Sequence, residues 1–400
     1  MVDGIIELQH TIRPPPRKEM SHAYIVKQSE EICKTLNALQ LRKILSDVYW
    51  EHLKSILHSV FMLGYKGKVV NTELFSEKHR TTVSHFLNNG KWNSLQFEKN
   101  LKKEVVDRIY RESRKSGEPV LCIVDDTIAS HTKPSSQAMY PIEAAYFHQS
   151  HLKKCQDYGH QAVSVMLSCN GLSLNYAMML YDKTRSKIEI VQQIINELPQ
   201  PPHAGYFLCD SWYTANKLMD AFAQKGFETI GALRTNRIIY PGQVRQQAKH
   251  FAAGICKEDP NVSLVTVGKR NYYVYRYQGP INEHADAVVL LSYPENAFGE
   301  AKALRVFIST HTELSTQEIL SLYVKRWHIE VFFRACKQKL AFDKCQLRKK
   351  TGITRMWLIL SFVHFICCTV VGYVGDFDEG YRYFRNCVLQ VALAQNRNSL

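Results

Sequence analysis

The sequence has 400 residues, 45% of them hydrophobic and 22% charged, so it predicts a folded protein with a sizeable core and excludes a disordered chain. Its formal net charge of +14 and pI near 9.2 favour a polyanionic partner, nucleic acid before membrane, because binding to phosphates releases counterions. The eleven cysteines show no CxxC pair and no zinc-like spacing, and they stand mostly in apolar runs, which is typical of free thiols in a reducing cytosol.

The first 115 residues have a helical and basic character. The PPPRK motif predicts an arm that is either flexible or rigid and extended. The first 20 residues contain no basic segment followed by an apolar one, so no signal peptide is expected. Residues 30–63 have helical apolar spacing, and residues 71–93 predict short helices with an Asn-Asn-Gly turn. Three basic residues there are candidates for contact with DNA: Arg80, Lys78 and His85. A solvated basic face on an ordinary helical subdomain is an equal alternative.

Residues 119–228 alternate between strand and helix patterns. The run PVLCIVDDT ends in two carboxylates, Asp125 and Asp126, and predicts a buried central strand. Two β-rich runs then flank Asn170-Gly171, the strongest short-range hairpin signal. An amphipathic helix follows, and GYFLCDSWYTANKLMDAFAQKG predicts a second buried strand ending in Asp210 and then a helix. This order predicts a mixed α/β domain.

Residues 229–310 interrupt that alternation. Three β-rich runs, separated by turns with no helical stretch between them, predict a β-meander inserted into the α/β domain. The loop LRTNR places Arg234 and Arg237 after a strand, where they can follow backbone phosphates. A solvated basic loop is the alternative for these two residues.

The apolar run at residues 356–374 has nearly the length of a membrane span. It contains Ser361 and His364 and stands alone, so a buried core helix is the favoured interpretation and no membrane partner is expected. The residues after it predict a short tail with one helix.

The segment LYVKRWHIEVFFRACKQK, residues 322–339, carries a polar stripe between apolar flanks. At 100° per residue, four polar residues share a face about 60° wide: Tyr323, Arg326, Glu330 and Lys337. On the same projection Lys325, His328 and Lys339 lie on the far side, where water is expected. The stripe is therefore either a buried Arg–Glu pair in a helix bundle or part of a catalytic site.

Two other carboxylates favour the catalytic alternative. Asp125 and Asp210 each end a strand-like run, and ligand sites gather at the carboxyl ends of strands, so we expect both to converge with Glu330. Three carboxylates remain ionised together only with a cation, and such hard oxygen ligands suit Mg²⁺ or Mn²⁺. Two such ions can activate a water or a 3′-hydroxyl in phosphodiester displacement, while Arg326 and Lys337 offset phosphate charge. A capping role is the alternative for either aspartate alone.

The spacing Tyr323-x₂-Arg326-x₃-Glu330-x₆-Lys337 resembles the Tyr-Arg-Glu-Lys signature of DDE transposases from bacterial insertion sequences. It looks like the branch related to the enzymes of composite elements that carry kanamycin and tetracycline resistance. The resemblance covers residues from about 70 to about 365. It implies a ribonuclease H-like catalytic domain with a β-rich insertion between the second Asp and the Glu.

The resemblance also implies roles for individual residues. Asp125 heads the Asp-x-Thr pattern of the first catalytic carboxylate, with Asp126 as the alternative because the acid is doubled. Asp210 matches the second, Asp-x-x-Tyr pattern, and Glu330 would be the third metal ligand. Phosphates and terminal bases near the break would be held by Tyr323, Arg326 and Lys337.

The implied reaction is cut-and-paste transposition. With Mg²⁺ or Mn²⁺, expected as two ions, a water nicks the ends of the element and the freed 3′-hydroxyl attacks target DNA. The expected partners are double-stranded DNA, as terminal inverted repeats and target, and a second copy of the chain in a homodimer on DNA. The expected location is the bacterial cytoplasm, at the nucleoid. The alternatives are an inactive, transposase-derived DNA-binding regulator and another ribonuclease H-like nuclease.

The predicted fold class is therefore α/β: a ribonuclease H-like mixed sheet flanked by helices, with an inserted β-rich subdomain and an N-terminal helical DNA-binding region. The predicted segments are residues 1–115 (helical, basic, DNA-binding), 116–228 (first catalytic part), 229–310 (β-rich insertion), 311–375 (second catalytic part with the Glu helix) and 376–400 (C-terminal tail).

Overall fold

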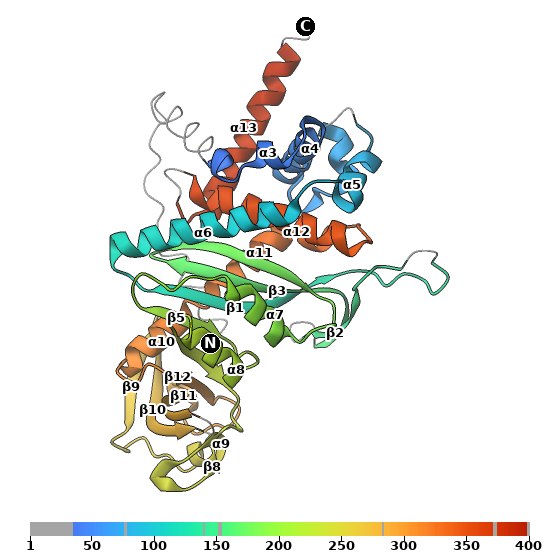
Figure 1. The fold of residues 1–400 in the computed structure, drawn as a ribbon. Coiled ribbons are helices and arrows are strands. Elements are labelled where there is room, and N and C mark those ends of the chain that lie inside the picture. Colours follow the sequence, from blue (N-terminus) through green and yellow to red (C-terminus); the bar gives the residue numbers. More distant parts are fainter. Residues whose placement is uncertain are drawn as a thin grey trace. The chain divides into compact units, whose positions relative to one another are not determined.

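The structure, a computed structural model, describes residues 35–75, 78–138, 141–150, 154–281, 284–370 and 374–397 (Figure 1). The PPPRK motif at residues 14–18 lies outside them. The chain forms two compact units, each built from segments that are distant in sequence. The described part of the first unit consists of residues 119–125, 198–281 and 284–327, and the second unit contains the remaining described residues.

The first unit is built around a sheet of three parallel strands followed by four antiparallel ones. Its strand order is β1-β5-β6-β12-β11-β10-β9. The bounds are β1 Val120–Ser130, β5 Gly205–Cys209, β6 Phe227–Leu233, β9 Val262–Val267, β10 Arg270–Ile281, β11 His284–Pro294 and β12 Arg305–Ser309. Every residue of β5 is buried, and this strand pairs in parallel with both β1 and β6, as expected of a central strand.

Strands β9 to β12 form the predicted antiparallel meander. A three-residue 3₁₀ turn, η5 (Glu295–Ala297), separates β11 from β12, and no α-helix lies between β9 and β12 among the described residues, as the turn-separated β-rich runs predict. Strand β11 ends at Pro294, which pairs with Tyr272 but has no N–H group to donate. Before the meander lie the short strands β7 (Ile238–Ile239) and β8 (Gln246–Gln247), the turn η4 (Pro241–Gln243) and helix α9 (Ala248–Ala252).

Two helices cover the sheet of the first unit. Helix α8 (Asn216–Ala223) packs on β6, and its Phe222 ring stacks on Phe207 of β5 with centroids 3.8 Å apart. Helix α10 (Thr316–Val324) begins with a capping box between Ser315 and Glu318, which satisfies two backbone N–H groups at its start. This helix contacts β6 and β9.

The second unit contains the later residues of β1 with β2 (Tyr146–Ser150), β3 (Cys155–Cys169) and β4 (Leu172–Tyr181). Strands β3 and β4 form the predicted hairpin, and the turn residues Asn170 and Gly171 have φ angles of 44° and 80°. Both angles are positive, as a two-residue hairpin turn requires, which explains the Asn-Gly signal.

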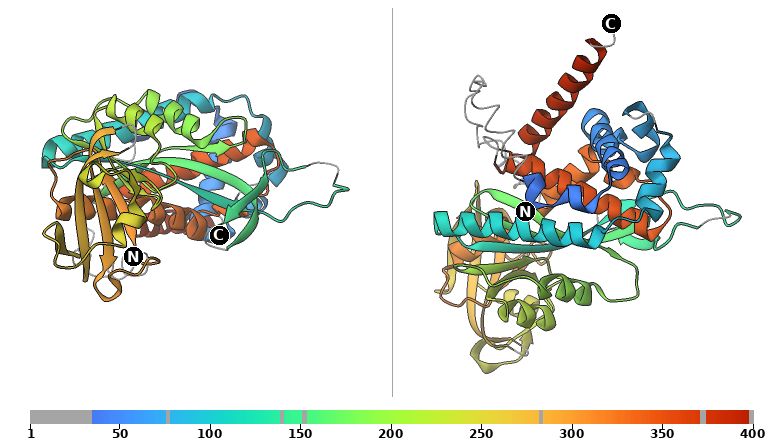
Figure 2. Two further views of the ribbon diagram at one scale, coloured as in Figure 1. Left: turned by 90° about the horizontal axis from the view of Figure 1, so that it is seen from below. Right: turned by 45° about the horizontal axis from the view of Figure 1, so that its top comes forward.

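Helices pack around these strands. Helix α6 runs along β3 and β4 (Figures 1 and 2). The helical elements are α3 Leu41–Ile44, α4 Asp47–Leu63, η2 Gly64–Lys66, η3 Val69–Phe75, α5 Arg80–Asn89, α6 Ser94–Ser116, α7 Lys187–Asn196, α11 Trp327–Lys339, η6 Phe342–Lys344, α12 Lys350–Thr369 and α13 Phe377–Arg397.

Helix α12 contains the apolar run that mimics a membrane span. It is the single helix of the described residues that is long and apolar enough to cross a membrane, and 78% of its most apolar window is buried inside the protein. It packs against β4, α5, α6 and α13. The prediction of a buried core helix is therefore confirmed, although the helix ends at Thr369, before the end of the apolar run.

The described cysteines are free thiols, and most of them are buried in apolar surroundings. Burial raises the pKa of the Cys345 thiol to about 11, so this side chain is a neutral, small hydrophobic group at ordinary pH. This agrees with the prediction from the sequence.

Candidate active site

Asp125 and Asp210 lie side by side in the first unit. Strands β1 and β5 are parallel neighbours with Val124 opposite Cys209, and the next residue along each strand is an aspartate. Adjacent strands are about 4.8 Å apart, so the two carboxylates share one small region. Asp210 follows the end of β5 as predicted, but β1 continues beyond Asp125 to Ser130. The expectation that both aspartates end their strands is therefore wrong for Asp125.

The continuation of β1 has a physical cause in the second unit. Its later residues bond to β3, where the Ser130 hydroxyl donates to Asp157 at 2.6 Å and the His131 N–H donates to the Tyr158 carbonyl at 2.8 Å. These bonds satisfy polar groups that a strand ending at Asp125 would leave to water.

Arg326 is the cationic partner of Asp125. Its Nη1 donates to Asp125 Oδ2 at 2.8 Å, and the two side chains are 15% and 19% exposed. Arg326 also hydrogen-bonds with Tyr323, whose ring packs against Phe307 with centroids 4.7 Å apart. Burial raises the pKa of Tyr323 to about 12, so its hydroxyl stays protonated at neutral pH. Tyr323 and Arg326 are thus the inward-facing polar residues that the stripe predicts.

The stripe does not lie on one helix. Helix α10 ends at Val324 and α11 begins at Trp327. Between them the N–H groups of Lys325 and Arg326 bond to carbonyls three residues back, at 3.0 Å each. Such bonds tighten the chain relative to an α-helix, so the projection at 100° per residue does not carry across the break. The predicted single face is wrong for this reason, although Glu330 and Lys337 do share a face of α11.

A turn holds the carboxylate of Asp210. Its Oδ1 accepts from the N–H groups of Trp212 at 2.9 Å and Tyr213 at 3.3 Å, which is the local pattern that Asp favours in turns. Tyr213 is fully buried and anchors the turn, whereas Trp212 is 41% exposed. Both bonds go to Oδ1, so this turn does not engage Oδ2.

Arg237 braces the same turn. Its Nη2 donates to the Thr214 carbonyl at 2.7 Å, and its side chain is half-buried. Arg234 is exposed three residues earlier. The sequence predicted both arginines as phosphate contacts and carried no signal for the bond between Arg237 and Thr214, because the two residues are 23 positions apart.

Asp126 has different partners in the second unit. Its Oδ2 accepts from Lys187 Nζ at 2.8 Å, and its Oδ1 accepts from the Gln161 amide. Successive side chains of a strand point to opposite faces, so the doubled acid sends one carboxylate to each face of β1.

The pKa of the buried Cys209 thiol depends on burial and on the charges around it. Burial raises its pKa well above the ordinary value, Asp210 and Asp125 raise it further, and Arg326 acts in the opposite direction. The carboxylates of Asp210 and Asp125 and the guanidinium of Arg326 therefore all lie near this buried thiol. Carboxylate oxygens are suitable ligands for Mg²⁺ or Mn²⁺, so the pair of aspartates fits such an ion by its chemistry. Over the described residues, no group of three or more His, Cys, Asp or Glu side chains is placed to hold a metal.

The predicted DNA-contacting residues of the N-terminal region lie in the second unit. Arg80 is the first residue of α5, and its N–H donates to Glu73 Oε1 at 2.8 Å. The side chains of Lys78, Arg80 and His85 are exposed. Their contact with DNA stays a prediction.

His328 makes contacts that the sequence did not suggest. Predicted to face water, it bonds to the hydroxyls of Ser168 and Ser173 on the β3–β4 hairpin. The Asn170-Gly171 turn allows the two serines to be paired from the sequence alone, but nothing in the sequence identifies His328 as their partner.

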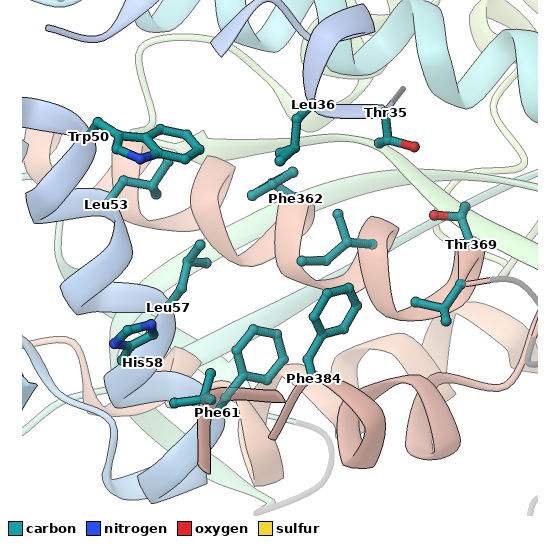
Figure 3. Close-up of a pocket in the computed structure, with 13 residues that line it drawn as sticks. Thr35, Leu36, Trp50, Leu53, Leu57, His58, Phe61, Phe362, Thr369 and Phe384 are labelled. Atoms are coloured by element: carbon teal, nitrogen blue, oxygen red, sulfur yellow. The ribbon is translucent and has the colours of Figure 1, made fainter. Parts of the chain in front are cut away.

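An apolar cavity of about 190 Å³ lies in the second unit among α4, α12 and α13 (Figure 3). Its walls include Leu53, Phe61, Phe362 and Phe384. None of its lining residues is a carboxylate, a lysine or an arginine, so it lacks the carboxylate ligands that Mg²⁺ or Mn²⁺ prefers and the cationic side chains that bind phosphate. The two aspartates of the first unit remain the candidate site.

Comparison with known proteins identifies the family of this chain. The family model described as Transposase DDE domain matches residues 116–366, and the comparison with curated proteins gives no match. The matched region covers well over half of the chain. It contains the residues described above near Cys209: Asp125, Asp210, Tyr323 and Arg326. The protein therefore belongs to the DDE transposase family, which supports a transposase function.

Proposed function

We propose that this transposase cleaves the ends of its own DNA element and joins them to target DNA. Asp125, Asp210 and Glu330 are the catalytic carboxylates in this proposal. The observation that carries it is the placement of Asp125 on β1 and of Asp210 just after the adjacent parallel strand β5, with Arg326 bound to Asp125, in a chain of the DDE family.

Divalent metal ions belong to the proposed reaction. The three carboxylates would hold Mg²⁺ or Mn²⁺, as two ions, whose chemistry is to activate the attacking hydroxyl and stabilise the leaving oxygen. Arg326 has five N–H donors in a planar fork, so it can keep its bond to Asp125 and donate to a phosphate as well. Lys337 and the protonated Tyr323 hydroxyl provide further donors to the DNA backbone.

Asp125 is preferred over Asp126 as the first carboxylate. Asp125 lies beside Asp210 and the buried Cys209, whereas Asp126 is bound by Lys187 and Gln161.

DNA is the partner on which a transposase acts. We propose that the exposed basic residues Lys78, Arg80 and Arg234 contact the DNA backbone, and that two copies of the chain assemble on paired terminal repeats. The net charge of +14 favours this binding at low ionic strength.

The test is strand cleavage on DNA that carries this gene with its native flanks. The wild type is compared with Glu330→Gln and Asp210→Asn, in Mg²⁺ and in EDTA. The matched control is Asp220→Asn, which changes an exposed carboxylate on α8. We expect discrete, metal-dependent breaks at the outer edges of an inverted repeat for the wild type and the control only. Binding to these ends without cleavage by any of the proteins would instead identify a DNA-binding regulator.

A further inference from the structure

His328 and two serines form a closed triangle of hydrogen bonds in the second unit. His328 Nδ1 lies 3.0 Å from Ser168 Oγ and 3.1 Å from Ser173 Oγ, and the two hydroxyls lie 2.8 Å apart. Nδ1 carries one hydrogen or one lone pair, depending on the tautomer, so it shares a single donor or acceptor function between two hydroxyls that can each donate and accept. His328 is 155 positions from Ser173 and 160 positions from Ser168, so local structure does not impose these contacts.

The serines present a rigid surface to the ring. They are register partners at the end of the β3–β4 hairpin, one pair away from its two-residue turn. Ser168 is 1% exposed, so its hydroxyl needs a protein partner. The register of a tight hairpin fixes the relative position of the two oxygens.

The first turn of α11 needs an anchor of this kind. The break after Val324 means that α11 is not a continuation of α10. The first N–H groups of a helix lack intrahelical partners, and helix ends fray. His328 is the second residue of α11, and Glu330 lies two positions further in the same turn.

We propose that His328 is a positioning residue for Glu330: it fastens the first turn of α11 to the β3–β4 hairpin and thereby fixes where the carboxylate is held. The catalytic part of this inference rests on the proposed function of Glu330. The anchor itself does not, since it is a property of the fold. Residues that orient a metal ligand or its helix commonly change activity by about 10–100-fold when removed.

Two substitutions at His328 distinguish the effect of its hydrogen bonds from the effect of its side-chain volume. In His328→Asn, the amide lies as many bonds from the backbone as Nδ1 does, so it can still reach both hydroxyls. His328→Leu fills similar space without a polar atom. Leucine is a better helix former than histidine or asparagine, so a loss seen only in the leucine variant cannot come from helix propensity.

The experiment measures hydrogen–deuterium exchange and DNA-end cleavage on the full-length protein. We expect faster exchange in peptides covering residues 327–333 for His328→Leu, with cleavage lower by about 10–100-fold and binding to DNA ends unchanged. His328→Asn should restore exchange and bring cleavage to within about threefold of the wild type. The control is His203→Leu, an exposed histidine in the loop before β5, which should match the wild type.

Several outcomes would overturn the proposal. Unchanged hydrogen–deuterium exchange and cleavage in His328→Leu would show that His328 does not anchor the helix. A loss of cleavage in His328→Asn equal to that in His328→Leu would show that the hydrogen bonds of the histidine are not what matters. If His328→Leu does not fold, the double variant Ser168→Ala/Ser173→Ala removes the same bonds from the other side and should show the same local exchange. If the wild type cleaves no DNA, the proposed function fails, while the exchange data still decide whether the anchor exists.

Discussion

Asp125 and Asp126 are consecutive residues of β1, yet each binds a different cation. Asp125 Oδ2 accepts from Arg326 at 2.8 Å, and Asp126 Oδ2 accepts from Lys187 at the same distance. The alternation of side chains along a strand produces this separation. Two adjacent carboxylates therefore have different environments, and we expect different consequences when each is neutralised.

Asp125→Asn should lower cleavage by at least about 10²–10³-fold, the loss typical of removing one electrostatic group from an active site. Asp126→Asn should retain cleavage to within about threefold and lower the free energy of unfolding by about 1–3 kcal/mol, because it weakens a bond to the half-buried Lys187. Strand cleavage and urea unfolding of both variants provide the measurement. Loss of cleavage only in the Asp126 variant would reverse the assignment.

Substitution of Arg237 should lower the free energy of unfolding, whereas substitution of Arg234 should weaken DNA binding. Arg237→Ala removes the donor to the Thr214 carbonyl, so the free energy of unfolding should fall by about 1.5–3 kcal/mol. Arg234→Ala should stay within about 0.5 kcal/mol of the wild type, because this side chain is exposed. Its effect should appear in DNA binding, with a salt dependence reduced by about one phosphate contact. Equal unfolding energies for the two variants would contradict the bracing role of Arg237.

Gly159→Ala should destabilise the packing of β3 on β1. A Cβ atom at Gly159 would lie 2.1 Å from the carbonyl oxygen of Ala129, and backbone must move to relieve the clash. Overpacking of this kind costs about 1–3 kcal/mol. The control is Gly254→Ala, where the nearest atom to the added Cβ lies 3.7 Å away and no loss is expected. Thermal unfolding compares the two, and an unaltered melting temperature for Gly159→Ala would show that this approach is not tight.

Asp182 should make stability sensitive to acid. Burial opposes ionisation of this carboxylate, but hydrogen bonds from Lys350 and Thr184 outweigh it and lower the pKa to about 2. A folded-state pKa below the unfolded value near 3.9 means that the contribution is complete above about pH 5 and is lost as the pH falls toward 2. Asp182→Asn should therefore show a flatter decline of unfolding free energy across that range.

The matched control for this pH series is Asp47→Asn, which changes a side chain that is 96% exposed. Its pH profile should follow that of the wild type. Parallel profiles for the wild type and Asp182→Asn would rule out Asp182 as a source of the acid sensitivity.

The local elements were predictable because neighbouring residues specify them. The Asn170-Gly171 turn needs two positive φ angles, and asparagine and glycine are the residues that adopt them at least cost. The continuous apolar run before Asp210 became β5, which is buried along its whole length because parallel strands flank it on both sides.

The break between α10 and α11 was not predictable from periodicity. Apolar spacing continues through Lys325 and Arg326, and neither residue is a helix breaker. The chain nevertheless turns there, and Arg326 bonds to Asp125. A single bond to a charged partner contributes more than the intrinsic helix preference of one or two residues, so the tertiary contact prevails.

By itself the sequence determined which acids, bases and aromatic residues this transposase has, in which order they follow its strands and helices, and where its tight turn lies. Only the tertiary structure decided which partner each of them meets: Arg326 for Asp125, Lys187 for Asp126, Thr214 for Arg237, and a pair of serines for His328. The physical reason is the distance along the sequence over which each kind of interaction acts. Turns and periodic faces arise from interactions over a few residues, whereas Asp125 and Arg326 are 201 positions apart and meet only after the strands and helices between them have packed.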